Sequence, residues 1–86
     1  MNPRRKAPYA EYDEEADAIY VWLTDAETVR SASLDDFRNL DFSADGAVVG
    51  VEFIDVSGGV DLEDIPHKQR VEQLIGELGL GIKIFA

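Results

Sequence analysis

Residues 39–54 read Asn-Leu-Asp-Phe-Ser-Ala-Asp-Gly-Ala-Val-Val-Gly-Val-Glu-Phe-Ile, and they decide the fold of this 86-residue chain. Two runs of alternating apolar and polar residues flank the Asp45-Gly46 pair. Asp-Gly favours a tight turn, because glycine adopts a positive φ without steric cost. The stretch therefore predicts a β-hairpin.

A two-residue turn at Asp45-Gly46 would fix which residues face one another across this hairpin. On the apolar face it sets Leu40 opposite Val51, Phe42 opposite Val49 and Ala44 opposite Ala47. A three-residue loop would shift the pairing by one, setting Phe42 against Val48 and Leu40 against Gly50, and the apolar residues would match less well. We therefore expect the two-residue register, with Leu40, Phe42, Val49 and Val51 forming the seat of a helix.

Two further strands precede the hairpin, and a third is weaker. Residues 18–23, Ala-Ile-Tyr-Val-Trp-Leu, are β-branched, aromatic or aliphatic on both faces, which predicts the central strand of the sheet. Residues 7–12 predict a first strand after Pro8, and residues 28–34 predict the weaker strand between the second strand and the hairpin.

A helix is expected after the sheet. Asp64-Ile65-Pro66 is a typical helix start, and Gly79 stands where a left-handed C-cap belongs. Val71, Leu74, Ile75 and Leu78 form one apolar stripe between them. Residues 80–85 alternate and could add a last strand. The fold class is therefore α+β, an antiparallel β-meander of about five strands with one C-terminal helix packed on one face.

Charge is unevenly placed along the chain. The net charge is −10, yet Arg4, Arg5 and Lys6 cluster at the start, so the rest carries 18 acidic against 5 basic residues, a charge of −13. We expect residues 1–8 to form a disordered basic tail and residues 9–86 a single domain. Such a body repels nucleic acid, whose affinity for proteins depends on Lys and Arg, and it suits a basic protein partner instead.

The chain has no cysteine, which excludes disulfides, thiol catalysis and cysteine-ligated metal sites. No apolar run approaches the roughly 18 residues of a membrane helix, and the start Met-Asn-Pro-Arg-Arg-Lys lacks the apolar stretch of a secretory signal. We expect a cytoplasmic protein with no membrane association. A short chain buries only about two-thirds of its unfolded surface, which favours a homodimer.

The candidate chemical residues are carboxylates and one histidine. Asp13, Glu15 and Asp17 have the opening spacing of a calcium loop, but its sixth position would be Ala18 and its twelfth Thr24, so we expect a solvated acidic turn. His67 is the single histidine and is expected at the surface near a helix N-terminus.

The sheet face opposite the apolar stripe could gather Asp41, Glu52 and Asp55, for which solvent-facing positions are the simpler interpretation. Gly58-Gly59 lacks the downstream Lys-Ser/Thr of a phosphate loop. Trp22 and the tyrosines are expected in a core or interface rather than a ligand cleft. No catalytic, cofactor-binding or metal-binding residue is therefore assigned, and no cofactor is expected.

Three stretches carry a resemblance to a known family. They are residues 12–23, Tyr-Asp-Glu-Glu-Ala-Asp-Ala-Ile-Tyr-Val-Trp-Leu, residues 45–57 from Asp45-Gly46 to Val56-Ser57, and Gly59-Val60-Asp61-Leu62 before the helix. Their order resembles the small bacterial family called domain of unknown function 2283. The resemblance implies a compact β-meander with a terminal helix, and it implies no activity or catalytic residue.

Two classes of function stay open at this point. The favoured one is a non-enzymatic protein-interaction or regulatory module, such as an antitoxin-like partner, that acts as a homodimer and whose acidic surface meets a basic protein. The alternative is a small-molecule or divalent-metal-binding domain, with weak hydrolase-like activity, that uses the carboxylates around residues 13–17 or Asp41 and Glu52.

Overall fold

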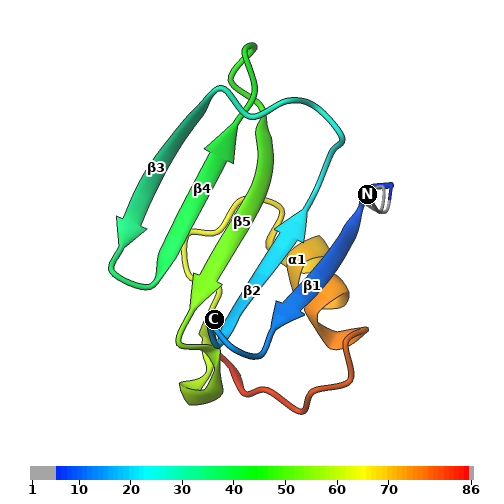
Figure 1. The fold of residues 1–86 in the computed structure, drawn as a ribbon, viewed down its shortest axis with the longest axis vertical. Helices are drawn as coiled ribbons and strands as arrows, with labels where there is room; N and C mark the ends of the chain where they lie inside the picture. Colours follow the sequence, from blue (N-terminus) through cyan, green and yellow to red (C-terminus); the bar gives the residue numbers. More distant parts are fainter. Residues whose placement is uncertain (1–5, 86) are drawn as a thin grey trace.

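A computed structural model of the chain describes residues 6–85, so residues 1–5 of the expected basic tail lie outside the described part. The elements are β1 (Tyr9–Asp13), β2 (Ala18–Trp22), β3 (Arg30–Asp35), β4 (Arg38–Phe42), β5 (Val48–Ile54), the 3₁₀ turn η1 (Val56–Gly58), β6 (Val60–Asp61), α1 (Lys68–Gly76) and β7 (Ile84–Phe85). The α+β class is confirmed. Strands β1 to β5 form one antiparallel sheet, and α1 follows it (Figure 1).

The order across the sheet is β1-β2-β5-β4-β3. The hairpin strand β5 therefore occupies the middle of the sheet, and β2, predicted to be central, lies beside it, between β1 and β5. The chain leaves β2 and crosses to the far edge, where it forms β3, before it returns through β4 and β5 (Figure 1). The two outer strands of this sheet are consequently β1 and β3.

The hairpin of residues 39–54 is confirmed, but its register combines the two alternatives. Leu40 pairs with Val51, as a two-residue turn predicts, whereas Phe42 pairs with Val48, as a three-residue loop predicts. A β-bulge between these pairs leaves Val49 as the additional residue, and its carbonyl accepts the N–H of Leu23 at 2.7 Å.

The bulge corrects one prediction about the core. Val49 is buried, yet it lies outside the main hydrophobic cluster, whereas Val48 packs against that cluster. At the turn itself, Ser43 donates its N–H to the carbonyl of Ala47 at 2.9 Å, and Gly46 takes a φ of 86°. A three-residue loop that ends on a left-handed glycine has this geometry.

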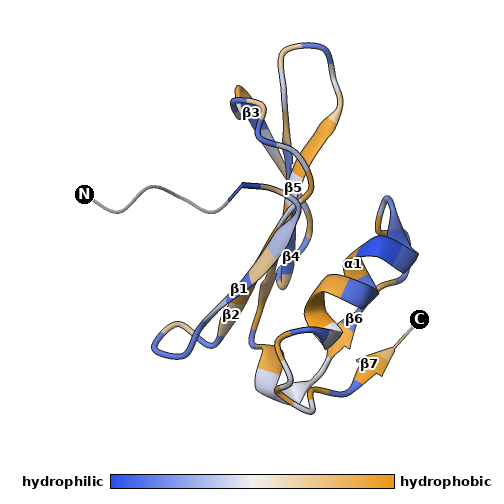
Figure 2. Cartoon of the chain, turned by 90° about the vertical axis from the view of Figure 1, so that its right-hand side faces the viewer, coloured by the Kyte–Doolittle hydropathy of each residue, from blue (hydrophilic) through white to orange (hydrophobic). Residues whose placement is uncertain are grey.

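The core fills the space between one sheet face and a second layer made of η1, β6, α1 and β7 (Figure 2). Its buried residues come from the sheet and from that layer: Ala10, Ile19, Val21, Leu40, Val51, Phe53, Val56, Val60, Leu62, Ile65, Val71, Leu74 and Ile75. The predicted helix stripe is confirmed, since Val71, Leu74 and Ile75 are buried and Leu78 packs against them.

The helix differs from the prediction in two respects: the strands on which it packs and the residue at which it begins. It lies chiefly over β2 and β1 rather than over the β4–β5 hairpin (Figure 1). It begins at Lys68, not near Asp64, because Asp64 and His67 both adopt left-handed conformations, with φ values of 63° and 54°, that interrupt a helix. It ends at Gly76. Gly79, three residues later, has the predicted positive φ, 67°, and its N–H donates to the carbonyl of Gly76 at 3.1 Å.

The last strand is short. Only Ile84 and Phe85 of residues 80–85 form β7, which pairs in parallel with β6. The N–H of Leu62 donates to the carbonyl of Phe85 at 2.8 Å, so this pair fastens the C-terminal segment to the second layer. Across residues 6–85, no helix has the length and apolar character needed to cross a membrane.

Candidate functional site

Hydrogen bonds connect the acidic turn between β1 and β2 to η1, and we call this connection, between Asp17 and Ser57, the joint. Asp17 has a φ of 52°, and its carboxylate accepts the hydroxyl of Ser57 at 2.7 Å and the backbone N–H of Ser57 at 3.2 Å. The hydroxyl of Tyr12 donates to the same carboxylate at 3.3 Å. Asp13 accepts the N–H of Ala16, three residues later, at 3.2 Å, a local side-chain hydrogen bond that supports the turn. Glu15 is exposed to solvent.

These contacts shift the pKa values of Asp17 and Tyr12. The hydroxyl of Ser57 lowers the pKa of Asp17 below its ordinary value, while burial and then the charge of Asp17 raise the pKa of Tyr12. The hydrogen bonds from Ser57 and Tyr12 thus favour the ionised form of Asp17. In the part of the chain from residue 6 to 85, no three His, Asp or Glu side chains are placed to hold a metal ion.

The sheet face opposite α1 carries two polar rows. In one row, Asp41 accepts hydroxyl hydrogen bonds from Tyr20 and Ser31. In the other, Asn39 donates to Glu52 at 2.9 Å and accepts the hydroxyl of Ser33 at 2.6 Å. Asp41 and Glu52 therefore share this face, as predicted, and each has partners on neighbouring strands.

Asp55 does not join Asp41 and Glu52. It follows the end of β5 in a left-handed conformation, with a φ of 59°, at the entry to η1. The possible gathering of Asp41, Glu52 and Asp55 on one face therefore does not extend to Asp55, because the chain turns away from the sheet at this residue.

The aromatic residues of β1 and β2 pack on one another. The rings of Tyr9 and Trp22 are stacked with centroids 4.7 Å apart, and the rings of Tyr20 and Trp22 are 4.3 Å apart. Tyr20 lies over Gly50, where an added Cβ would come within 2.4 Å of its hydroxyl oxygen. The glycine is what allows the ring to reach Asp41.

His67 is exposed at the N-cap of α1, as predicted, with no side-chain capping hydrogen bond. Gly58 and Gly59 end η1, and Gly59 needs its φ of 115° and its missing Cβ, since a Cβ would lie 2.4 Å from the Phe85 ring. Gly59 therefore serves packing, whereas a Cβ at Gly58 would meet nothing within 4 Å, and a phosphate loop at this pair stays excluded by sequence.

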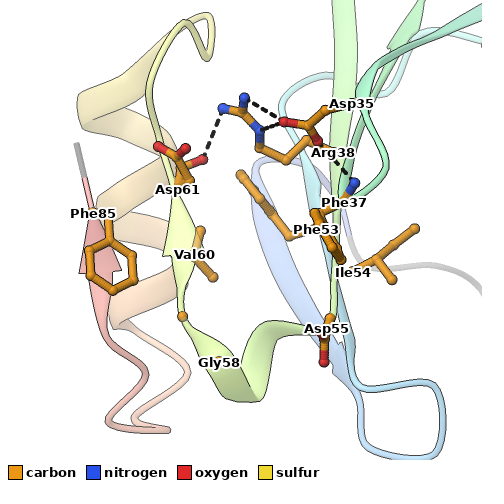
Figure 3. A pocket seen from close by; sticks show the side chains of 11 residues that line it. Asp35, Phe37, Arg38, Phe53, Ile54, Asp55, Gly58, Val60, Asp61 and Phe85 are labelled. Carbon is orange, nitrogen blue, oxygen red and sulfur yellow. Dashed lines mark hydrogen bonds and ion pairs between the residues drawn. The ribbon is translucent and has the colours of Figure 1, made fainter.

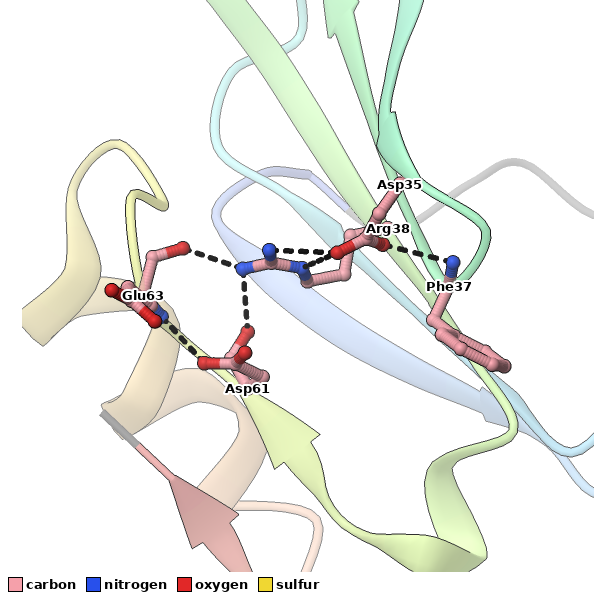
Figure 4. A network of polar contacts seen from close by, with 5 residues as sticks. All are labelled: Asp35, Phe37, Arg38, Asp61 and Glu63. Atoms are coloured by element: carbon pink, nitrogen blue, oxygen red, sulfur yellow. Dashed lines mark hydrogen bonds and ion pairs between the residues drawn. The ribbon is translucent and has the colours of Figure 1, made fainter.

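Arg38 is a candidate functional residue that the sequence did not reveal. Its guanidinium donates to the Asp35 carboxylate from Nε at 3.0 Å and from Nη2 at 2.8 Å, and its Nη1 donates to the backbone carbonyls of Asp61 and Glu63 (Figure 4). Its side chain is only 12% exposed. The hydrogen bond with Asp35 raises the pKa of Arg38 and lowers that of Asp35. In the sequence, the one feature that indicated this ion pair was an arginine three residues after an aspartate, at an expected strand start.

Beside Arg38 a cavity of about 280 Å³ opens between the ends of β4 and β5 and the β6–β7 pair (Figure 3). Phe85 lies on the β7 side of it, with Phe37 and Ile54 on the sheet side, and Asp55 and Asp61 also line it (Figure 3). The combination of aromatic walls and carboxylates makes this the most distinctive concave site of the described chain.

The fold and these sites define a small α+β domain whose polar networks connect its strands and loops. The model of the family "Protein of unknown function (DUF2283)" matches residues 10–57, more than half of the chain. The chain belongs to this family, as the resemblance predicted. Neither the comparison with curated proteins nor that with solved structures gave a match.

Proposed function

We propose that this chain is a non-enzymatic protein-interaction module that acts as a homodimer, and that β3 is the contact strand. The observation that carries the proposal is that β3 is one of the two edge strands of the sheet and, unlike β1, is exposed at all of its six residues. An outer strand presents unpaired backbone N–H and C=O groups that another strand can bind.

The charges along β3 favour a second copy of this chain as the partner. Arg30 stands at its start, and Asp35 and Asp36 stand at and just after its end. Two copies that pair in antiparallel fashion about Ala32 place the cationic end of one strand beside the anionic end of the other, twice over. Parallel pairing would bring like charges together, so a second copy fits this edge in the antiparallel direction.

Apolar side chains flank the same edge. Val29 is 58% exposed and Leu34 is 41% exposed. Antiparallel pairing about Ala32 would bring Leu34 of each copy opposite Arg30 of the other and would shield both apolar residues from water. A single six-residue strand pair buries less than a standard interface of about 1,600 Å², so we expect a dimer of micromolar affinity.

The partners of the carboxylates favour this function over the ligand-binding alternative. Asp17 accepts from Ser57 and Tyr12, Asp41 accepts from Tyr20 and Ser31, and Glu52 accepts from Asn39. The carboxylates that a metal or hydrolase site would use are thus hydrogen-bonded within the fold. The cysteine-free composition suits the reducing cytoplasm, where we place the protein.

Sedimentation velocity over about 5–500 µM protein tests the proposal, with four charge variants. Arg30→Glu and Asp36→Arg each set like charges beside one another, so each should weaken the dimer at least about tenfold. The double variant reverses both ends and should restore it. Arg70→Glu changes a charge on the exposed face of α1 and should leave the dimer intact.

A wild-type chain that stays monomeric at 500 µM would refute the homodimer. So would a double variant that associates no better than the two single variants, because the contact would then not pair these charges.

A further inference from the structure

The cavity beside Arg38 combines apolar walls with excess negative charge. Phe37 and Phe85 are 53% and 48% exposed, so both rings present apolar surface to solvent at the cavity. Their positions on either side of the opening are visible in Figure 3. Three aspartates and one arginine line the same cavity, so its formal charge is 1 − 3 = −2.

The arginine leaves most of this negative charge unpaired. Within residues 6–85, Arg38 forms its ion pair with Asp35, and its remaining hydrogen bonds go to backbone carbonyls (Figure 4). Asp61 accepts the N–H of Glu63 at 2.9 Å through one carboxylate oxygen. The carboxylates of Asp55 and Asp61 therefore line the cavity beside aromatic rings without an ion pair to Arg38.

We propose that this cavity binds the side chain of a lysine or arginine carried by a basic segment of a partner protein. The aliphatic stem of such a side chain would lie against the rings of Phe37 and Phe85, and its cationic head would lie beside Asp55 and Asp61. This inference rests on the proposed role as an interaction module, but not on the dimer contact at β3.

The chemistry of the cavity selects this occupant over others. A chain with a net charge of −10 repels the phosphates of nucleic acid. In residues 6–85 the carboxylates do not converge as metal ligands, whereas aromatic faces beside separated carboxylates suit an organic cation with an apolar stem.

The glycine at position 59 supports the geometry of the wall. Its missing Cβ allows the Phe85 ring to lie against the backbone between η1 and β6, where a Cβ would be 2.4 Å from the ring. Phe85 is thereby held at the cavity and kept out of the core.

A titration followed by ¹⁵N-labelled NMR tests the inference. The probes are Nα-acetyl-lysine methylamide and its uncharged norleucine counterpart, which keeps the stem and lacks the ammonium group. The lysine probe should shift the amide signals of Phe37, Asp55, Gly59 and Phe85, and the norleucine probe should shift them at least about fivefold less at equal concentration.

Matched variants separate a local site from the general charge of the chain. Asp55→Asn/Asp61→Asn should weaken lysine binding at least about fivefold, and asparagine retains the left-handed conformation of residue 55. Glu14→Gln/Glu15→Gln removes the same charge from the exposed β1–β2 turn and should leave binding unchanged. Phe37→Ala changes an exposed side chain, so it should fold normally and bind the lysine probe more weakly.

Equal shifts from the lysine and norleucine probes would overturn the inference, as would equal losses in the two double variants. The outcome is independent of the dimer, because sedimentation reports the β3 contact separately. A monomer that still binds lysine at this cavity would refute only the homodimer, and a dimer without lysine binding would refute only this site.

Discussion

Asp17 joins two parts of the chain that lie 40 residues apart in sequence. Its carboxylate binds the N–H and hydroxyl of Ser57, and its own carbonyl accepts the N–H of Val56 at 3.0 Å. Both ends of this joint fall inside the residues 10–57 matched by the family model. The acidic motif of the β1–β2 turn is thus a folding device that positions η1 against the sheet.

Replacing Asp17 by asparagine should make stability less dependent on pH. An unfolded aspartate has a pKa of about 3.9, and the folded value for Asp17 is lower, so the unfolded state binds more protons in between. The stabilisation is present above about pH 4 and is lost as the pH falls below it. We expect Asp17→Asn to lower the urea midpoint at pH 7 and to differ progressively less from wild type below about pH 4.

Glu15→Gln is the matched control, because it removes an exposed charge from the same turn. A gap between Asp17→Asn and wild type that stays constant from pH 7 to pH 2 would contradict the predicted role of the ionised carboxylate.

Gly50 gives a second prediction at a single residue. A Cβ at this position would lie 2.4 Å from the Tyr20 hydroxyl and 2.6 Å from its ring, so Gly50→Ala must displace the ring and break its bond to Asp41. We expect a loss of about 1–3 kcal/mol in the free energy of unfolding. Gly58→Ala, where an added Cβ meets nothing within 4 Å, should change it by less than about 0.5 kcal/mol. Similar urea midpoints for the two variants would refute the prediction.

At the scale of elements, the local pattern was enough to predict the strands and the hairpin of β4 and β5. It could not predict the bulge, because the two registers compete within the hairpin alone. The register is decided by β2, whose following residue Leu23 binds the carbonyl of Val49. The start of α1 was misplaced for a related reason: Pro66 suits a first turn, but the chain enters the helix through a left-handed His67.

Arg38 connects β4 to the segment between β6 and α1, and Arg38→Lys should loosen that connection. Lysine carries the charge but lacks the planar fork that reaches Asp35 and two carbonyls together. We expect a loss of about 1–3 kcal/mol in the free energy of unfolding, measured by urea denaturation. Arg70→Lys, which alters an exposed helix residue whose guanidinium bonds Gln73, should cost less than about 0.5 kcal/mol. Equal losses in both variants would argue against the connection.

For the whole molecule, the contacts that sequence reasoning missed join distant segments. Tyr20 and Asp41 are 21 residues apart, and Arg38 and Glu63 are 25 apart. The first pair depends on β2 lying beside β5, and the second depends on the second layer folding back over the sheet. A local pattern contains neither arrangement, so the candidate cavity could not be predicted, although Asp55 and Gly58-Gly59 had been singled out for other chemistry.

The net charge of −10 leads to a prediction for the entire domain. Repulsion among its carboxylates opposes the compact state, and salt screens that repulsion. Raising NaCl from about 0.02 to 0.5 M should therefore raise the thermal midpoint by about 2–5 °C. Glu14→Lys/Glu15→Lys changes the net charge from −10 to −10 + 4 = −6, so its midpoint should rise less. A fall in the wild-type midpoint with salt would show that attractive pairs dominate instead.

The hydrogen bonds from Arg38 to backbone carbonyls affect which positions of this domain can change in sequence. Because every amino acid carries a carbonyl, the connection at position 63 does not depend on which side chain stands there. The same holds at position 61, whose carbonyl Arg38 also binds, so the side chain that lines the cavity there is free to vary while the connection to the sheet is retained. Such an arrangement would let related domains acquire different specificities on one scaffold, and it offers a protein engineer a position to diversify without loosening the fold.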